Sequence, residues 1–130
     1  MMEEPPVRHP TAASIEYLSA RLGFRNDPVM QDWELEVANP LDLDRYLTLF
    51  AEVINKDDLR FTLADIIIQA FEETGLDLEL DARWRPFLDE LVENMGVHAH
   101  QIWYWACFDV ELEDVWRVAP YMRSICGAYK

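Results

Sequence analysis

Apolar residues recur at helical spacing through the middle of the chain, and this pattern limits the possible folds more than any other feature. Residues three and four positions apart lie on one face of an α-helix. The stripes comprise Leu43, Tyr46, Leu47, Phe50, Val53 and Ile54, then Leu63, Ile66, Ile67, Ala70 and Phe71, and then Trp84, Phe87, Leu88, Leu91, Val92 and Met95. The segment 40–95 is therefore predicted to be helical.

Cap residues mark where the helices should begin and end. Asp27-Pro28 and Asn39-Pro40 each pair an N-cap residue with a proline suited to the first helical position. Gly23, Gly75 and Gly96 lie where helices should end. The predicted helices cover 11–22 (or from Ser14), 28–37, 40–54, 62–74 (or from just before Thr62), 85–95, 98–107 and 115–126, the last with a break near Pro120 and a cap at Gly127.

The sum is an all-α bundle of five to seven helices with short connections. Residues 28–38 and 97–110 could instead contain a short strand, and 76–80 alternates polar and apolar residues, so one short hairpin remains an alternative. Residues 1–10 contain three prolines and are predicted to be a disordered leader. Residues 11–130 are predicted to form a single helical domain.

The charge of the chain is strongly negative. Eleven Lys and Arg face 25 Asp and Glu, which gives a formal net charge of −14. Such a surface repels nucleic acids and anionic membranes, because both are bound through clustered basic residues. It favours encounter with a basic protein partner. The alternative is that the acidity only maintains solubility.

The sequence predicts a cytoplasmic protein. Residues 1–10 lack the apolar segment of a signal peptide, and the longest apolar runs are too short to cross a bilayer. Cys107 and Cys126 are too few for a disulfide framework and match no zinc motif. We expect them to be buried free thiols.

No catalytic or cofactor motif is visible, so no cofactor is predicted. The serines stand in no G-x-S-x-G context, and the four glycines form no phosphate-binding loop. His98 and His100 are weak metal-ligand candidates that Cys107 and Asp109 could complete, but on a helix the two rings would diverge by roughly 200°. Asp77-x-Glu79-x-Asp81 resembles the start of a calcium loop without its required glycine and glutamate.

The densest carboxylate cluster lies in an aromatic-rich region. Its members are Asp109, Glu111, Glu113 and Asp114. A solvated acidic turn and an acid–base pair are two interpretations. The third is a docking patch for Arg or Lys side chains, with an exposed Trp105 or Trp116 as its aromatic anchor. Trp103 and Trp105 cannot both face inward on a helix, so one of them should be partly exposed.

Two segments resemble parts of small bacterial proteins of unassigned function. They are Met30 to Ala38 and Tyr104-Trp105 followed by Glu111 to Asp114. In composition the chain is also similar to the immunity proteins of bacterial toxin systems, which are small, acidic and cytoplasmic and neutralise basic toxins. That resemblance implies a binding protein without catalytic machinery.

The leading hypothesis is a non-enzymatic binding protein, an immunity-type inhibitor of a cationic toxin or enzyme. Its partner-binding residues would be Trp105, Asp109, Glu111, Glu113, Asp114 and Trp116. One alternative is a metal-binding domain or metal-dependent enzyme that uses His98, His100 and nearby carboxylates. The other is a helical subunit of a homo-oligomer.

Overall fold

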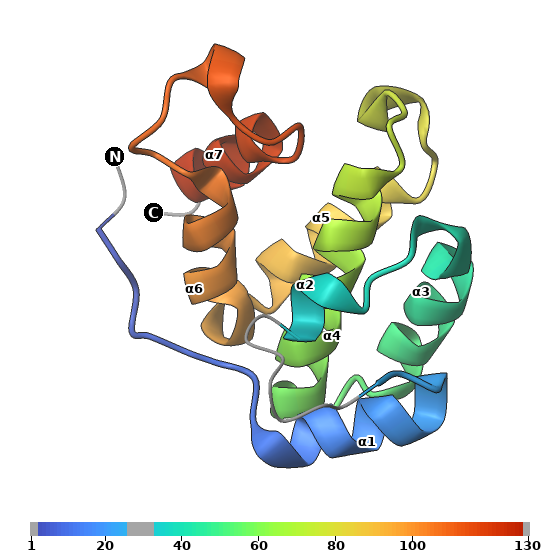
Figure 1. Ribbon diagram of the computed structural model, residues 1–130. Helices are drawn as coiled ribbons and strands as arrows, with labels where there is room; N and C mark the ends of the chain where they lie inside the picture. Colours follow the sequence, from blue (N-terminus) through green and yellow to red (C-terminus); the bar gives the residue numbers. More distant parts are fainter. Residues whose placement is uncertain (1–2, 26–32, 129–130) are drawn as a thin grey trace. The chain divides into compact units, whose positions relative to one another are not determined.

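The computed structural model describes residues 3–25 and 33–128, and the fold is all-α (Figure 1). The helices are α1 (Ala12–Leu22), α2 (Trp33–Glu36), α3 (Leu43–Glu52), α4 (Asp57–Glu73), α5 (Trp84–Glu93), α6 (Met95–Ala106) and α7 (Ala119–Ala128). In the described ranges three short 3₁₀ helices lie in the connections: η1 (Pro40–Asp42), η2 (Leu78–Leu80) and η3 (Leu112–Asp114). The described ranges contain no strand, and the predicted all-α class with short connections is confirmed.

The chain divides into two compact units. We call His9–Thr74 the N-terminal unit, and Gly75–Lys130 together with Met1–Arg8 the C-terminal unit. In the N-terminal unit α4 packs against α1, α2 and α3. In the C-terminal unit α6 packs against both α5 and α7.

Helix α1 begins with a reciprocal capping box. Thr11 Oγ1 accepts a hydrogen bond from the backbone N–H of Ser14, and Ser14 Oγ accepts one from the backbone N–H of Thr11, each at 3.1 Å. Gly23 ends the helix in the left-handed conformation with φ of 73°. Ser14 Oγ also lies 2.8 Å from Thr62 Oγ1, so the cap connects α1 to α4. The predicted helix 11–22 is present with its expected C-cap.

The core of the N-terminal unit is centred on α4. Its apolar side chains are buried around most of the helix, including the consecutive residues Ile66, Ile67 and Ile68. Arg60 is buried as well, and its guanidinium carbon lies 3.9 Å from the centre of the Phe50 ring. The cation–π contact with Phe50 offsets part of the cost of burying that charge. A helix apolar on most sides is typical of a central core element.

Several predicted boundaries were wrong for local reasons. Helix α4 starts at Asp57 instead of Thr62, since Asp57 and Asp58 in its first turn complement the helix dipole. Gly96 lies inside α6 and does not end a helix. At the other end of the chain, α7 begins at Ala119, which places Pro120 in the first turn, and it continues past Gly127.

The two ambiguous regions contain helix in the part that is described. Trp33–Glu36 forms α2, whereas residues 28–32 of the predicted helix 28–37 lie outside the described residues. Residues 97–106 belong to α6, and the following residues form a loop. Residues 3–10 carry no regular secondary structure.

Candidate functional site

The loop after α6 forms the base of the candidate site. Cys107 closes the helix in the left-handed conformation, with φ of 51°, which is uncommon for a residue with a side chain. Its backbone N–H donates to the carbonyl of Tyr104 at 3.2 Å, and its own carbonyl accepts from Val110 N–H at 3.1 Å. The chain therefore turns sharply at the end of α6.

Arg123 of α7 holds this turn in place. Its Nε donates to the carbonyl of Ala106 at 2.7 Å, and its terminal nitrogen donates to the carbonyls of Cys107 and Val110, each at 2.6 Å. Carbonyls at the end of a helix have no partner within it, and a cation there also complements the helix dipole. One guanidinium thus fixes the loop relative to both α6 and α7.

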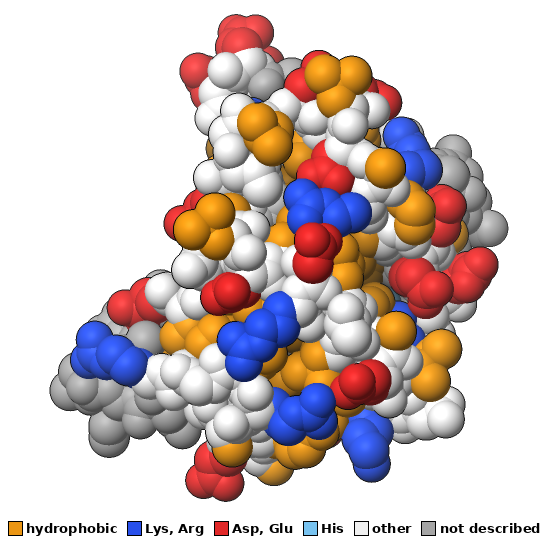
Figure 2. All heavy atoms as spheres, turned by 90° about the vertical axis from the view of Figure 1, so that its right-hand side faces the viewer, with side chains coloured by type: hydrophobic (Ala, Val, Ile, Leu, Met, Phe, Trp, Pro, Cys, Tyr) orange, Lys and Arg blue, Asp and Glu red, His pale blue; other side chains and the backbone are white. Residues whose placement is uncertain are grey.

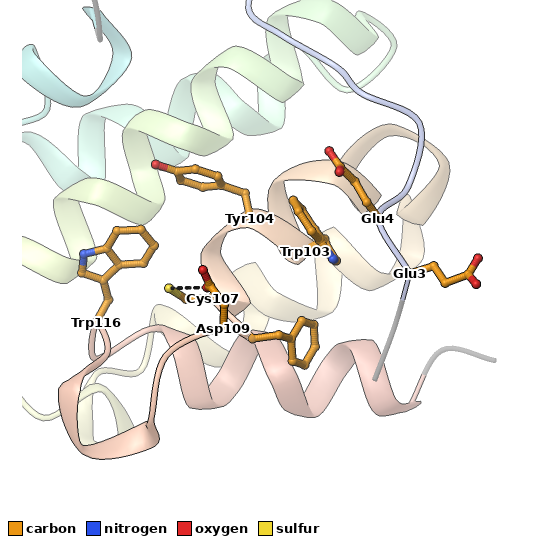
Figure 3. Close-up of a pocket in the computed structure, with 8 residues that line it drawn as sticks. Glu3, Glu4, Trp103, Tyr104, Cys107, Asp109 and Trp116 are labelled. Atoms are coloured by element: carbon orange, nitrogen blue, oxygen red, sulfur yellow. Dashed lines mark hydrogen bonds between the residues drawn. The ribbon is translucent and has the colours of Figure 1, made fainter.

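A pocket of about 640 Å³ lies beside this loop (Figure 3). Aromatic and acidic side chains dominate its wall. The lining residues are Glu3, Glu4, Trp103, Tyr104, Cys107, Phe108, Asp109 and Trp116. All of them belong to the C-terminal unit.

One wall of the pocket consists of Tyr104 and Trp116. Their ring centres lie 5.7 Å apart, and the side chains are 46% and 37% exposed. Trp105 packs behind Trp116 at 4.8 Å and is only 1% exposed, so its predicted role as an exposed anchor is wrong. Trp105 shares the buried face of α6 with Ile102 and His98, three and seven positions away on a helix. Trp116 and Tyr104 are the exposed rings of this wall.

Trp103 stands on another side of the pocket (Figure 3). Its ring stacks on His100 with the centres 5.7 Å apart, and His100 Nε2 lies 3.2 Å from Glu4 Oε2. This contact joins residues that are far apart in the sequence. It places the N-terminal segment, with Glu3 and Glu4, at the pocket.

Three carboxylates give the pocket its negative charge. Glu3, Glu4 and Asp109 are all exposed, and Asp109 Oδ1 accepts a hydrogen bond from Cys107 Sγ at 3.7 Å (Figure 3). Burial, followed by the charge of Asp109, raises the pKa of the Cys107 thiol. A raised pKa leaves less of the reactive thiolate at neutral pH.

The rest of the predicted carboxylate cluster does not line the pocket. Glu111, Glu113 and Asp114 are exposed on the loop that contains η3, between Asp109 and Trp116. They extend the negative charge along the loop, but of the predicted residues only Asp109 and Trp116 line the pocket. The structure therefore brings together Asp109 and Trp116 of the predicted set.

The predicted metal-ligand candidates point to different partners. His98 is buried and its Nδ1 bonds Gln101 Oε1, whereas His100 bonds Glu4. No group of three His, Cys, Asp or Glu side chains is placed to hold a metal within the described ranges. In the calcium-like segment, Asp77 Oδ1 caps η2 by accepting from Glu79 N–H, and Asp81 pairs with Arg83 at 2.8 Å.

Charges of both signs occur elsewhere on the surface. On the face drawn in Figure 2, basic and acidic side chains are interspersed with hydrophobic ones. The net charge of −14 therefore does not form one uniform acidic surface on that face. The combination that distinguishes the pocket is carboxylates beside partly exposed aromatic rings.

The comparisons with known proteins add no relative: no family model, no curated protein and no solved structure matches the chain. In the part of the chain that the structure describes, every helix is too short or too polar to cross a bilayer.

Sequence reasoning missed several lining residues. Glu3 and Glu4 stood in the predicted leader, and no local pattern connects them to α6. Tyr104 and Phe108 lie in the aromatic-rich region but were not among the predicted partner-binding residues. The available signal was the expectation that Trp103 or Trp105 would be partly exposed, and the partly exposed one is Trp103.

Proposed function

We propose that the chain is a non-enzymatic binding protein that captures a basic protein partner, in the manner of an immunity protein that inhibits a cationic toxin or enzyme. The observation that carries the proposal is the pocket, where Tyr104 and Trp116 are partly exposed beside Asp109. Partly exposed aromatic residues with a polar rim are typical of binding hot spots. The carboxylates supply a charge complementary to a basic surface.

The acidic loop after the pocket supports the same function. Glu111, Glu113 and Asp114 are exposed and lie shortly after Asp109 in the chain. Charges at the rim of an interface mainly accelerate association and contribute less to the affinity of the final complex. We therefore assign steering to this loop and anchoring to the pocket.

The test is affinity capture with a charge-matched control. The tagged chain is exposed to an extract of the organism that encodes it, beside a variant with Glu111, Glu113 and Asp114 changed to Lys. The control changes Glu73, Asp89 and Glu93 to Lys, which alters the net charge equally at other exposed positions. Retained proteins are identified by mass spectrometry, purified and measured for direct binding.

We expect a basic protein to bind the wild type and the control, and to associate more slowly with the loop variant. Its association rate should also fall as salt rises, because screening weakens the attraction between exposed charges. If both triple variants slowed association equally, the effect would come from net charge and not from the position of the loop carboxylates. A retained set without any basic protein that binds directly would contradict the proposed function.

A further inference from the structure

We infer that the pocket accepts one arginine side chain, with the guanidinium packed between the aromatic rings and Asp109. The inference rests on the proposed function, since it names the group by which the basic partner would be held. It assigns separate roles to the aromatic faces and to the carboxylate. Both roles follow from the residues that line the pocket.

The lining favours a cation. Ring faces of Trp and Tyr attract positive charge through their quadrupole, and Trp103, Tyr104 and Trp116 all border the pocket. Asp109 adds a full negative charge between the tryptophans (Figure 3). The described lining residues include no Lys or Arg, and the guanidinium of Arg123 is bonded to three backbone carbonyls of the loop. A cation from outside would therefore meet rings and carboxylates.

The lining favours guanidinium over other cations. A guanidinium is flat, so it can stack on an aromatic ring while its N–H groups donate to a carboxylate in the same plane. The ammonium of lysine has no flat face, and a quaternary ammonium has no N–H group to donate to Asp109. The volume of about 640 Å³ also leaves room for the peptide backbone that carries the side chain.

A second hollow in the same unit shows why the aromatic pocket is the better cation site. It has a volume of about 330 Å³, and its lining includes Leu76, Leu80, Asp81 and Arg83. The carboxylate of Asp81 already receives two side-chain hydrogen bonds from Arg83, at 2.9 and 2.8 Å. That hollow contains no aromatic ring, and its arginine is part of the chain itself.

The direct test is a titration of the full chain with single amino-acid probes, followed by the indole N–H signals in two-dimensional NMR. The probes are Nα-acetylarginine amide, its neutral isostere Nα-acetylcitrulline amide, Nα-acetyllysine amide and tetramethylammonium. We expect the signals of Trp103 and Trp116 to shift, with arginine binding about 5- to 30-fold more tightly than citrulline. The absence of any shift up to about 100 mM arginine amide, where even a very weak site responds, would overturn the inference.

Two variants locate the site. Asp109→Asn keeps the shape of the side chain and should weaken arginine binding while leaving citrulline binding unchanged. Asp89→Asn removes an exposed carboxylate on α5 of the same unit and should change neither. Trp116→Leu should abolish the response at Trp103, with retention of the fold checked by circular dichroism. Equal effects of Asp109→Asn and Asp89→Asn, or tighter binding of tetramethylammonium than of arginine, would overturn the assignment.

Capture of the basic partner separates this inference from the proposed function. If the partner binds Asp109→Asn and Trp116→Leu as tightly as the wild type, the arginine site is wrong and the proposed function stands. If the pocket binds arginine amide and no basic protein is captured, the proposed function fails while the cation site remains.

Discussion

Two regions of the molecule, α4 of the N-terminal unit and the pocket of the C-terminal unit, place large apolar side chains in different environments. In the N-terminal unit, α4 is surrounded by other helices and its central residues Leu63, Ile66 and Ile67 are fully buried. In the C-terminal unit, Tyr104 and Trp116 stay partly exposed around a pocket bordered by carboxylates. Leaving aromatic surface in water forgoes the stabilisation that its burial would give. The comparison is consistent with the proposal that the pocket serves recognition, whereas burial around α4 contributes stability.

The largest expected effect tests how much burial on α4 contributes to the stability of the N-terminal unit. Leu63→Ala should lower the free energy of unfolding by about 2–5 kcal/mol, because it removes buried methyl groups and leaves a cavity. Leu41→Ala is the matched control in the same unit, since Leu41 is 91% exposed, and it should change the stability by less than about 0.5 kcal/mol. Urea denaturation followed by circular dichroism measures both. Similar losses for the two variants would show that burial on α4 does not determine the stability of the unit.

The second prediction concerns the loop at the base of the pocket. Arg123→Met removes the donor for three carbonyls, and we expect a loss of about 1–3 kcal/mol in stability. The amides of 107–110 should exchange with deuterium faster than in the wild type, because the turn loses its anchor. Arg123→Lys should not restore protection, since one ammonium cannot reach all three carbonyls as the planar guanidinium does.

The control for this prediction is an arginine with an exposed partner. Arg21 bonds Glu52 at 3.0 Å, and both side chains are about half exposed. Arg21→Met should leave stability and loop exchange unchanged, because exposed ion pairs contribute little. Slower or unchanged exchange of 107–110 in Arg123→Met would contradict the anchoring role.

Much of the fold could be predicted from the sequence because its helices follow local rules. The stripe residues Leu43 to Phe50 lie in α3 and Trp84 to Val92 lie in α5, and Gly23 caps α1 as expected. The start of α4 was missed because Asn55 to Asp58 reads as a polar connector, although acidic residues also suit a first helical turn. Such errors arise where one residue type fits two local structures.

The candidate site was only half predictable. Asp109 and Trp116 stood out because they are close in sequence. Trp105 points inward because it lies on the buried face of α6. His98 is buried on the same face, and because it is polar, the pattern of apolar residues did not identify that face as buried. The contact between Glu4 and His100 spans most of the chain, and no local signal indicates such a pairing. Long-range proximity depends on the path of the chain, which propensities and spacing do not define.

The smallest expected effect concerns the reactivity of the two cysteines, both of which lie in the C-terminal unit. Burial raises the pKa of Cys126 to about 11, and burial together with the charge of Asp109 raises that of Cys107. The thiolate is the reactive form, so a raised pKa means less thiolate at neutral pH and slow alkylation of both residues. The rate should increase with pH until the pKa is reached. Cys107 is half-buried and should react before Cys126, which is buried in α7.

The variant Asp109→Asn separates the two causes of the raised pKa of Cys107, which are burial and the charge of Asp109. Removing the negative charge should lower the pKa of Cys107 and increase its alkylation by iodoacetamide severalfold at pH 7.5, because one of the raising contributions is lost. Cys126 serves as the internal control, since only burial raises its pKa. Mass spectrometry of each cysteine-containing peptide over time gives both rates. If Cys126 reacted as fast as Cys107, the core around α7 would open readily, and the C-terminal unit would differ from α4 in local stability as well as in its exposed aromatic surface.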